Sequence, residues 1–554
     1  MDRLGLAPCG VYRAALVALR AVRSYRTFSP LPLRAVYFLW HFPSGGGLLL
    51  PGPPFRAAHC PVESGSSSPC TRIGRERLPR LLFSLYQIGG SCICYNINMS
   101  VDSFSKIVKW LLLATLVGGM VGVLDAAFLK LLDKALSARA GVPGYYVCLP
   151  FVLYLVAVLS RRVAKTHKDF STDAVIKRIN AYRGVSVISA VKTFVLSIVT
   201  MAAGGSAGKE APCADVGAAL ASWVGRVLHL DATDQRRLMI CGVSAGFAGV
   251  FGVPVCGALF GLEVLWVGHL FYQLLFPALV AGITSYAVTS YLGVNYLYHP
   301  LSFSPVFSEF FFLKVIVAGV FFGLVALLFI EMNKVVRSAL RLITLRSGMF
   351  MTCMVGGLLV VLVAYGASPL YIGLGMDGIN GPLSGQVVHP LGFLYKMFTT
   401  CVTLSAGGIG GIITPIFFVG AQAGAALSAW LQVDSATLAA LGLVAVLAGA
   451  ANTPLAASVM AIELFGAPVA PYATVACVLS FLITGRQSIF PHQRISYDSG
   501  KIPQEPALKT YRGPHRRVTD VPSQLPVRVS SVSRLRHRVK RALPKLRSAR
   551  LRTK

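Results

Sequence analysis

Charged side chains are scarce in this sequence, and acidic ones are the scarcest. Only 13% of the 554 residues are Asp, Glu, Lys or Arg, whereas soluble globular proteins average about 25%. Because so few charged groups could not cover the surface of a water-soluble protein of this length, that class is excluded. Hydrophobic residues make up 55% of the chain, and apolar stretches recur from residue 107 to residue 483. Several approach the ~20 residues that cross a bilayer, which predicts an all-α, multi-pass integral membrane protein.

Two kinds of chemical site are also missing. The sequence has no phosphate loop ending in GK[ST] and no pattern typical of a nucleophilic triad, so it does not predict an enzyme. The twelve cysteines form no framework, since most lie in apolar segments and Cys92 and Cys94 are too close together for an ordinary zinc pair. We therefore expect neither a metal site nor a cofactor.

Basic residues gather at the two ends of the chain. Residues 1–100 contain 11 Arg and 3 acidic residues, and residues 491–554 contain 17 Lys or Arg and 3 acidic residues. Basic flanks beside membrane spans are typical of the positive-inside rule and of attraction to anionic lipid, and we favour this interpretation over nucleic-acid binding. A further basic cluster from Arg161 to Arg178 should lie on the same side. Both termini are therefore expected in the cytoplasm, with the protein in the plasma (inner) membrane.

The composition divides the chain into three parts. Residues 1–98 mix Arg with Pro, Gly and Ser, which is typical of a disordered extension, of a targeting segment, or of a start codon assigned too early, with Met99 as the functional start. Residues 99–493 are predicted to form the transmembrane domain, with repeat halves at about 105–293 and 311–490. Residues 494–554 are predicted to be a basic, disordered cytoplasmic tail.

The hydrophobic runs predict membrane spans, many of them broken by Gly or Pro or shorter than a full crossing. The predicted spans are residues 107–135, 145–160, 185–203, 237–266, 270–292, 311–337, 349–366, 391–406, 413–431, 436–450 and 455–483.

An internal repeat relates the two halves. The first contains AGGSAGKEAPCADVGAALASWVG followed by GVSAGFAGVFGVPVCGALFGLEVL, and the second contains SAGGIGGIITPIFFVGAQAGAALSAW followed by GLVAVLAGAANTPLAASVMAIELF. Pro254 and Glu263 are nine residues apart, as are Pro454 and Glu463. Repeated halves with broken helices are typical of transporters whose site lies at the repeat interface near the middle of the membrane.

Each half has a glycine-rich segment at the start of a helix, before Glu210 in the first half and before Pro415 in the second. Such a start leaves backbone N–H groups free, and the helix dipole adds partial positive charge there. Two helix starts that converge on one point would bind an anion without a buried Lys or Arg. The alternative for any single glycine is close helix packing, but the repeated pair favours an anion site.

Glu210 stands at the head of one of these helices, within the sequence GKEAP. An acid inside a membrane is costly and indicates a function, here competition, because its side chain can occupy an anion site until it is protonated. A plain ion pair with Lys209 is the alternative. Glu263 and Glu463 lie late in their spans and are predicted to bond backbone amides instead.

Taken together, these segments resemble the CLC family of chloride channels and proton-coupled chloride transporters, over roughly residues 105–492. GSAGKEAP at 205–212 is similar to the family's G-K/R-E-G-P element, GGIITP at 410–415 to its G-x-F-x-P element, and NTPLAASVMAIEL at 452–464 to its penultimate helix. The resemblance implies a homodimer with one pore per subunit, built from inverted-topology halves of tilted and broken helices, here in a short form without regulatory CBS domains. It also implies that Glu210 is the gating glutamate.

The same resemblance implies the residues that contact the transported anion, expected to be chloride. They are Gly208, Lys209, Ala211, Phe170, Ser171, Ile412, Ile413 and Phe490. Several depart from the family pattern. Phe170 stands at the position of a coordinating serine, so Ser171 or backbone amides must substitute for it, and Phe490 replaces a pore tyrosine. Ile413 replaces a phenylalanine, and Ala211 replaces the glycine after the glutamate.

These features predict a Glu210-gated chloride channel of the voltage-gated CLC type, or an uncoupled carrier. Val264 stands where the resemblance implies a proton-relay acid in the transporters, so the inner end of a proton route is missing. The alternatives are a chloride/proton antiporter with another proton route, fluoride export, and a membrane receptor or scaffold that uses the fold without transport.

Overall fold

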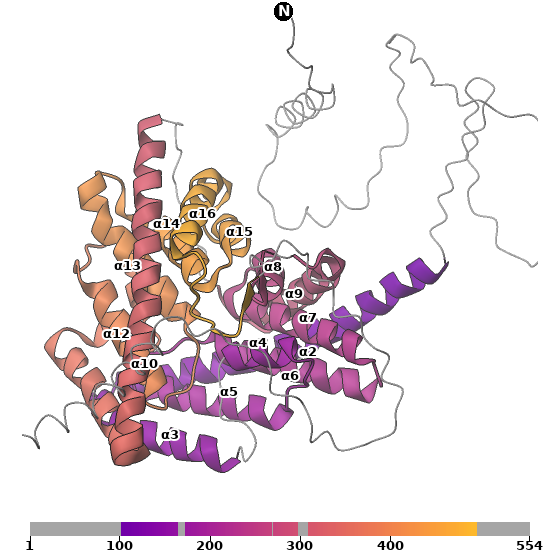
Figure 1. The fold of residues 1–554 in the computed structure, drawn as a ribbon, viewed down its shortest axis with the longest axis horizontal. Helices are drawn as coiled ribbons and strands as arrows, with labels where there is room; N and C mark the ends of the chain where they lie inside the picture. The colour runs from indigo at the N-terminus through magenta and orange to yellow at the C-terminus, as the bar shows by residue number, and fades with distance from the viewer. Residues whose placement is uncertain (1–100, 164–171, 269, 297–308, 496–554) are drawn as a thin grey trace, which may run out of the picture. The chain divides into compact units, whose positions relative to one another are not determined.

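A computed structural model describes residues 101–163, 172–268, 270–296 and 309–495 (Figure 1). The predictions for residues 1–98 and for the tail beyond Ile495 therefore lie outside the described residues. Within them the chain is almost entirely helical, which confirms the predicted all-α class. One short parallel pairing joins β1 (Trp266–Val267) to β2 (Arg494–Ile495).

The first half of the chain contains the helices that precede residue 293. They are α2 (Val101–Ala140), η2 (Tyr145–Cys148), α3 (Leu149–Val163), α4 (Thr172–Asn180), α5 (Val187–Ala202), α6 (Glu210–Val227), α7 (Ala232–Phe251), α8 (Pro254–Glu263) and α9 (Tyr272–Tyr291).

The second half contains the helices from residue 309 onward. They are α10 (Glu309–Gly366), η3 (Pro369–Tyr371), α11 (Asp377–Leu383), α12 (Gly392–Ser405), α13 (Ile413–Leu431), α14 (Ser435–Ala451), α15 (Pro454–Phe465), η4 (Ala467–Val469) and α16 (Ala470–Thr484).

Full-length and partial membrane helices occur together. Among the described residues, five helical segments are long and apolar enough to cross a bilayer, whereas α3, α5, α8, α14 and α15 are apolar but shorter. Helices that do not cross alone are typical of transporters with broken spans. This mixture confirms the prediction that many spans fall short of a full crossing.

The repeat is visible as two matching helix pairs, α6 with α7 and α13 with α14. Each second helix begins with an aspartate cap: the Asp231 side chain accepts a hydrogen bond from the Asp234 amide, and the Asp434 side chain accepts one from the Thr437 amide. Each pair also packs at a glycine of its first helix, where an added Cβ would strike the backbone carbonyl of Gly242 in the first half or Gly442 in the second. The same local chemistry therefore builds both halves.

Two of the predicted spans are wrong because each contains a helix break. Residues 237–266 divide into α7 and α8 at Gly252, whose φ of 73° ends α7, and Pro254 begins α8. Residues 455–483 divide into α15 and α16 at Gly466, whose φ is 95°. Glycine tolerates a positive φ, and proline favours the first turn of a helix. These residues therefore end one helix and begin the next inside a continuous hydrophobic run, where hydropathy alone gives no sign of a helix boundary.

Helices α10 and α6 complete the comparison with the predicted spans. The predicted spans 311–337 and 349–366 are confirmed, because α10 consists of two helices that meet at a kink at Gly348, where φ is 85° and ψ is 174°. Helix α6 was absent from the predicted spans because Glu210 and Asp215 lower its hydropathy, yet it is almost wholly buried. Tertiary packing rather than lipid surrounds it.

Candidate anion-transport site

The two glycine-rich segments meet in the buried interior of the protein. The Gly208 amide donates to the Gly411 carbonyl, and the Gly411 amide donates to the Gly208 carbonyl, each at 2.7 Å. Helix α6 begins two residues after this crossing, at Glu210, and α13 begins two residues after it, at Ile413. The two helix starts therefore converge, as the repeated glycine blocks predicted.

The Glu210 carboxylate lies on the start of α13. It accepts hydrogen bonds from the Ile413 amide at 2.6 Å, the Thr414 amide at 3.2 Å and the Thr414 hydroxyl at 2.7 Å. The residue is 1% exposed. Free amides at a helix start and a hydroxyl are the donors that an anion binds, so the carboxylate occupies an anion-binding position.

Lys209 does not neutralise Glu210. Its ammonium group lies 5.6 Å from the ring centroid of Phe251, and no ion pair joins it to Glu210 within the described chain. The plain ion pair considered from the sequence is therefore not formed. The other neighbours of Glu210, namely Gly208, Ala211 and Ile413, are buried.

Hydroxyl groups from both halves hold the crossing segments in place. The Ser206 amide donates to the Thr403 hydroxyl at 3.1 Å, and the Ser206 and Thr400 hydroxyls are 2.8 Å apart. Conversely, the Ile409 amide donates to the Thr200 hydroxyl at 3.3 Å. Sequence reasoning missed these residues, because Thr and Ser in an apolar helix look like ordinary packing residues until their partners are known.

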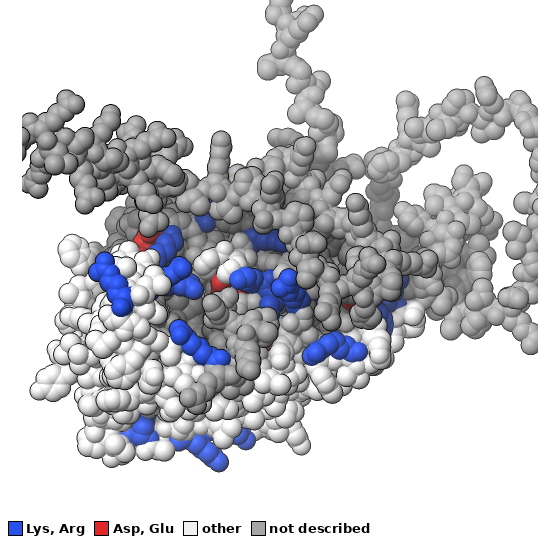
Figure 2. Space-filling model, turned by 60° about the horizontal axis from the view of Figure 1, so that its bottom comes forward, with Lys and Arg blue, Asp and Glu red and all other residues white. Residues whose placement is uncertain are grey.

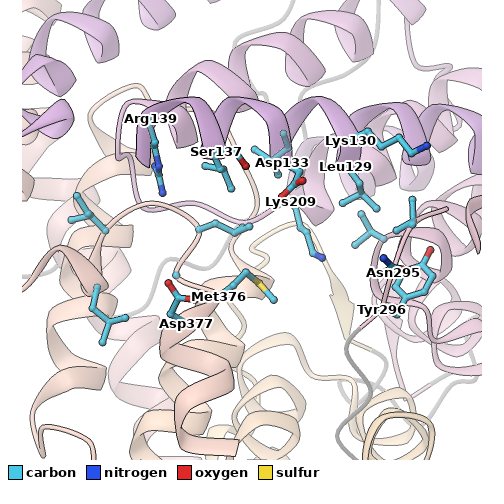
Figure 3. Close-up of a pocket in the computed structure, with 18 of the residues that line it drawn as sticks. Leu129, Lys130, Asp133, Ser137, Arg139, Lys209, Asn295, Tyr296, Met376 and Asp377 are labelled. Atoms are coloured by element: carbon cyan, nitrogen blue, oxygen red, sulfur yellow. The ribbon is translucent and has the colours of Figure 1, made fainter. Parts of the chain in front are cut away.

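Two cavities approach the crossing. The larger, about 960 Å³, is lined by Lys209 and by residues at the carboxyl end of α2 and after α10 (Figure 3). The smaller, about 480 Å³, is lined by Gly411, Ile412 and Phe490 and by residues 333–345 of α10. They lie at opposite ends of residues 349–366, which span about 27 Å at 1.5 Å per residue. That length is close to the hydrocarbon thickness of a bilayer.

We name these spaces the outer and inner cavities after the predicted orientation. Helix α3 begins beside Tyr145, which lines the larger cavity, and it ends near Arg161 in the basic cluster predicted to be cytoplasmic. In the predicted orientation, the larger cavity is the outer one. Lys209 lines it, and the next residue, Glu210, stands between the two cavities.

Phe490 lines the inner cavity. The segment that contains it is tied to the start of α4, where the Asp173 carboxylate accepts a hydrogen bond from the His492 amide at 2.9 Å. Phe170 and Ser171 lie outside the described residues, but Thr172, which follows them directly, lines the same cavity. Val264 is fully buried at the end of α8 and lines neither of these cavities.

Glu263 and Glu463 bond backbone amides, which confirms that prediction. Glu263 accepts from the first free amides of α15, at Leu455 and Ala456 (3.1 and 2.9 Å). Glu463 accepts in the same way from the amides at the start of α8 (2.9 and 2.8 Å). The reciprocal pair is what a pseudo-two-fold axis between inverted halves produces.

Comparison with known proteins agrees with this architecture. The sequence profile of the voltage gated chloride channel family matches residues 152–485. A chloride/fluoride channel protein from Pseudomonas syringae pv. tomato is 35% identical over 73% of this chain and 90% of its own length. The solved structure of a CLC-type fluoride/proton antiporter is 26% identical with a TM-score of 0.66, covering 71% of this chain and 99% of that one.

A slow cyanobacterial chloride/proton antiporter shares the fold, with 20% identity and a TM-score of 0.58 over 69% of this chain and 96% of its own. The resemblance inferred from the repeated glycine blocks is thereby confirmed. This chain belongs to the voltage gated chloride channel (CLC) family and is a multi-pass membrane protein for anion transport.

Proposed function

We propose that Glu210 is the gate of an anion path that runs between the starts of α6 and α13. The observation that carries this proposal is the position of the carboxylate, which is bonded to the Ile413 and Thr414 amides and to the Thr414 hydroxyl. These donors suit any small anion. A permeating anion therefore competes with the Glu210 carboxylate for the same three groups.

Protonation opens this gate. A neutral carboxyl group forms weaker hydrogen bonds than a carboxylate and gains less from the positive end of a helix dipole. An anion from the outer cavity then displaces it and passes Ile412 and Phe490 toward the inner cavity. Flux is expected to rise as the pH on the outer side falls.

The path accepts fluoride as well as chloride. Two of the relatives named above are a chloride/fluoride channel protein and a fluoride/proton antiporter. A small, strongly hydrated anion enters an apolar interior only where hydrogen-bond donors replace its water. The hydroxyl of Thr414 beside two free amides supplies such donors, whereas the neighbouring Ile412 and Phe490 side chains supply none.

Anion movement is not tightly coupled to protons. Proton transfer through a low-dielectric interior needs titratable groups or water at both ends of its route. Val264 and Phe490 provide no such group at the inner end. The alternative, proton antiport through another route, is supported by the antiporter among the similar structures.

The chain works as a homodimer in the plasma (inner) membrane, with one path per subunit, cytoplasmic termini and no enzymatic activity. The faces of α8 and α15 support the dimer. Val255, Leu455 and Ile462 are exposed there, beside the half-buried carboxylate of Glu463. A carboxylate so close to the surface at membrane depth is costly against lipid, so a second copy covers this face.

Flux from proteoliposomes tests the gate. Vesicles loaded with chloride or fluoride are assayed with ion-selective electrodes at several external pH values. Wild type should release both ions, faster at low pH, and Glu210→Gln should keep its flux but lose most of the pH dependence. Glu331→Gln, which alters an exposed acid on α10, should behave as wild type. An unchanged pH profile in Glu210→Gln contradicts the gate, and no release of either ion favours the receptor or scaffold.

A separate recording tests coupling. A chloride gradient is imposed without a pH gradient, and the external pH is followed. We expect chloride movement with little or no stoichiometric proton movement. Sustained uphill proton movement that Glu210→Gln abolishes would show that the protein is an antiporter.

A further inference from the structure

The outer cavity carries cationic groups that the gate does not use. Lys130, Arg139 and Lys209 line it, against Asp133 and Asp377. In Figure 3 the Arg139 side chain extends from α2 toward the chain segment that leads to Met376 and Asp377. This segment, residues 372–376, is called the outer loop below.

Lys396 of α12 lies behind the outer loop and is fully buried. Its ammonium group donates to the carbonyls of Gly373 at 2.8 Å and Ile372 at 3.5 Å, and it lies 5.0 Å from the ring centroid of Phe418. No carboxylate pairs with it among the described residues. Carbonyl dipoles and a ring face, rather than a carboxylate, therefore compensate this buried ammonium group.

Arg139 lies against the same loop. Its guanidinium donates to the carbonyls of Met201 and Ala202 at 2.5 and 3.5 Å and stacks 4.6 Å from the ring centroid of Tyr145. It too forms no ion pair within the described chain. A Cβ added at Gly373 would lie 3.0 Å from Arg139 Nη2, and one added at Gly375 would lie 2.8 Å from Lys396 Nζ. Two cations without acidic partners therefore contact one short loop.

The outer loop itself is suited to an anion. Gly373 and Gly375 have φ values of 58° and 75°, and alternating left-handed residues turn successive N–H groups into an anion-binding concavity. The Gly373 amide is bonded to the Gly204 carbonyl. The next three amides, of residues 374–376, donate to no group of the described chain, and all three residues line the cavity.

We propose that the outer loop, with Arg139 and Lys396, forms a second anion-binding site, which holds a small halide in the outer cavity before it reaches Glu210. The inference rests on the proposed function, because the halide held at this second site is the one that then moves to the Glu210 gate. Lys209 lines the same cavity and directly precedes Glu210, so a halide bound there lies on the side from which it would reach the gate.

The test separates binding from passage. The initial rate of anion uptake is measured against external fluoride or chloride for Lys396→Met and Arg139→Met. The half-saturating concentration should rise about fivefold to tenfold, as expected for losing one partly screened charge at short range, while the maximal rate stays within about twofold. Lys396→Arg and Arg139→Lys keep the positive charge, so their half-saturating concentrations should stay close to that of wild type. Lys314→Met removes a charge outside the cavity and should have no effect.

Titration calorimetry in detergent with sodium fluoride or sodium chloride supplies the second measurement. Glu210→Gln should bind halide, and adding Lys396→Met or Arg139→Met should weaken that binding by the same factor. Unchanged half-saturation and unchanged binding in either neutral variant overturn the outer site. If wild-type vesicles move no halide at all, the gate proposal fails, whereas calorimetry still decides whether the outer loop binds one.

Discussion

Glu210 is a buried acid that pairs with no cation among the described residues, and its environment explains why it is tolerated. Two amides and the Thr414 hydroxyl surround its carboxylate, while Lys209 points to Phe251 instead. Hydrogen bonds to a charged group at a helix start can replace an ion pair. The sequence predicted the acid and the helix start, but Thr414 emerged as a partner only from the structure.

Thr414→Val should release the gate at higher pH. The variant removes the 2.7 Å hydrogen bond to the carboxylate while keeping the shape of the side chain. A hydrogen bond to a charged group contributes about 1.5 kcal/mol or more, which is roughly a tenfold change in an equilibrium. With saturating anion, the midpoint of the flux–pH curve should therefore move upward by about one pH unit.

The measurement is chloride and fluoride efflux across a pH series. Thr414→Ser keeps the hydroxyl and is the matched control. A valine variant whose curve superposes on that of wild type would show that the hydroxyl does not hold the gate.

Helices α8 and α15 illustrate how elements from the two halves depend on each other. Neither begins with a side-chain cap of its own, because valine and threonine at their N-caps make no side-chain hydrogen bond. Instead Glu263 at the end of α8 caps α15, and Glu463 near the end of α15 caps α8. Each short helix is thus completed by the other repeat.

Glu263→Ala should destabilise the protein. It leaves the Leu455 and Ala456 amides without an acceptor, and the loss of a charged acceptor for buried donors costs about 2 kcal/mol. The apparent Tm of the detergent-solubilised protein, followed by loss of the monodisperse peak after heating, should fall.

Glu331→Ala is the control for this substitution. Its ion pair with Lys334 is about half exposed, and such surface pairs contribute about 0–1 kcal/mol. If Tm fell equally in the two variants, the reciprocal capping would add no more to the stability of the protein than an exposed ion pair does.

The described part of the chain combines an apolar body with a face rich in Lys and Arg. On the face shown in Figure 2, the coloured charged groups are mostly Lys and Arg, with few Asp or Glu. A positive surface raises the local concentration of anions and attracts anionic lipid. Both effects suit an anion transporter, and neither requires the two ends of the sequence.

Residues 1–98 and the chain after residue 500 should be dispensable for transport. Neither has the apolar period needed to bury a core, whereas the strand pairing of β2 with β1 lies within the retained part. Purified 99–500 should run as a dimer on size-exclusion chromatography and move anions at the rate of the full chain. A truncated protein that inserts normally and moves nothing would refute this division.

The amino-acid sequence by itself determined the membrane class, the repeat, the glycine-rich helix starts, the acid at the start of α6 and the structural role of Glu263 and Glu463. These features are local, because they depend on spacing, hydropathy and the backbone preferences of Gly and Pro. Tertiary structure alone decided the reciprocal caps, the hydroxyls around Ser206 and the cations behind the outer loop. Each of these features joins residues that are far apart in the chain. A single sequence does not show which hydrogen-bond donor will lie beside which distant acceptor once the chain has folded.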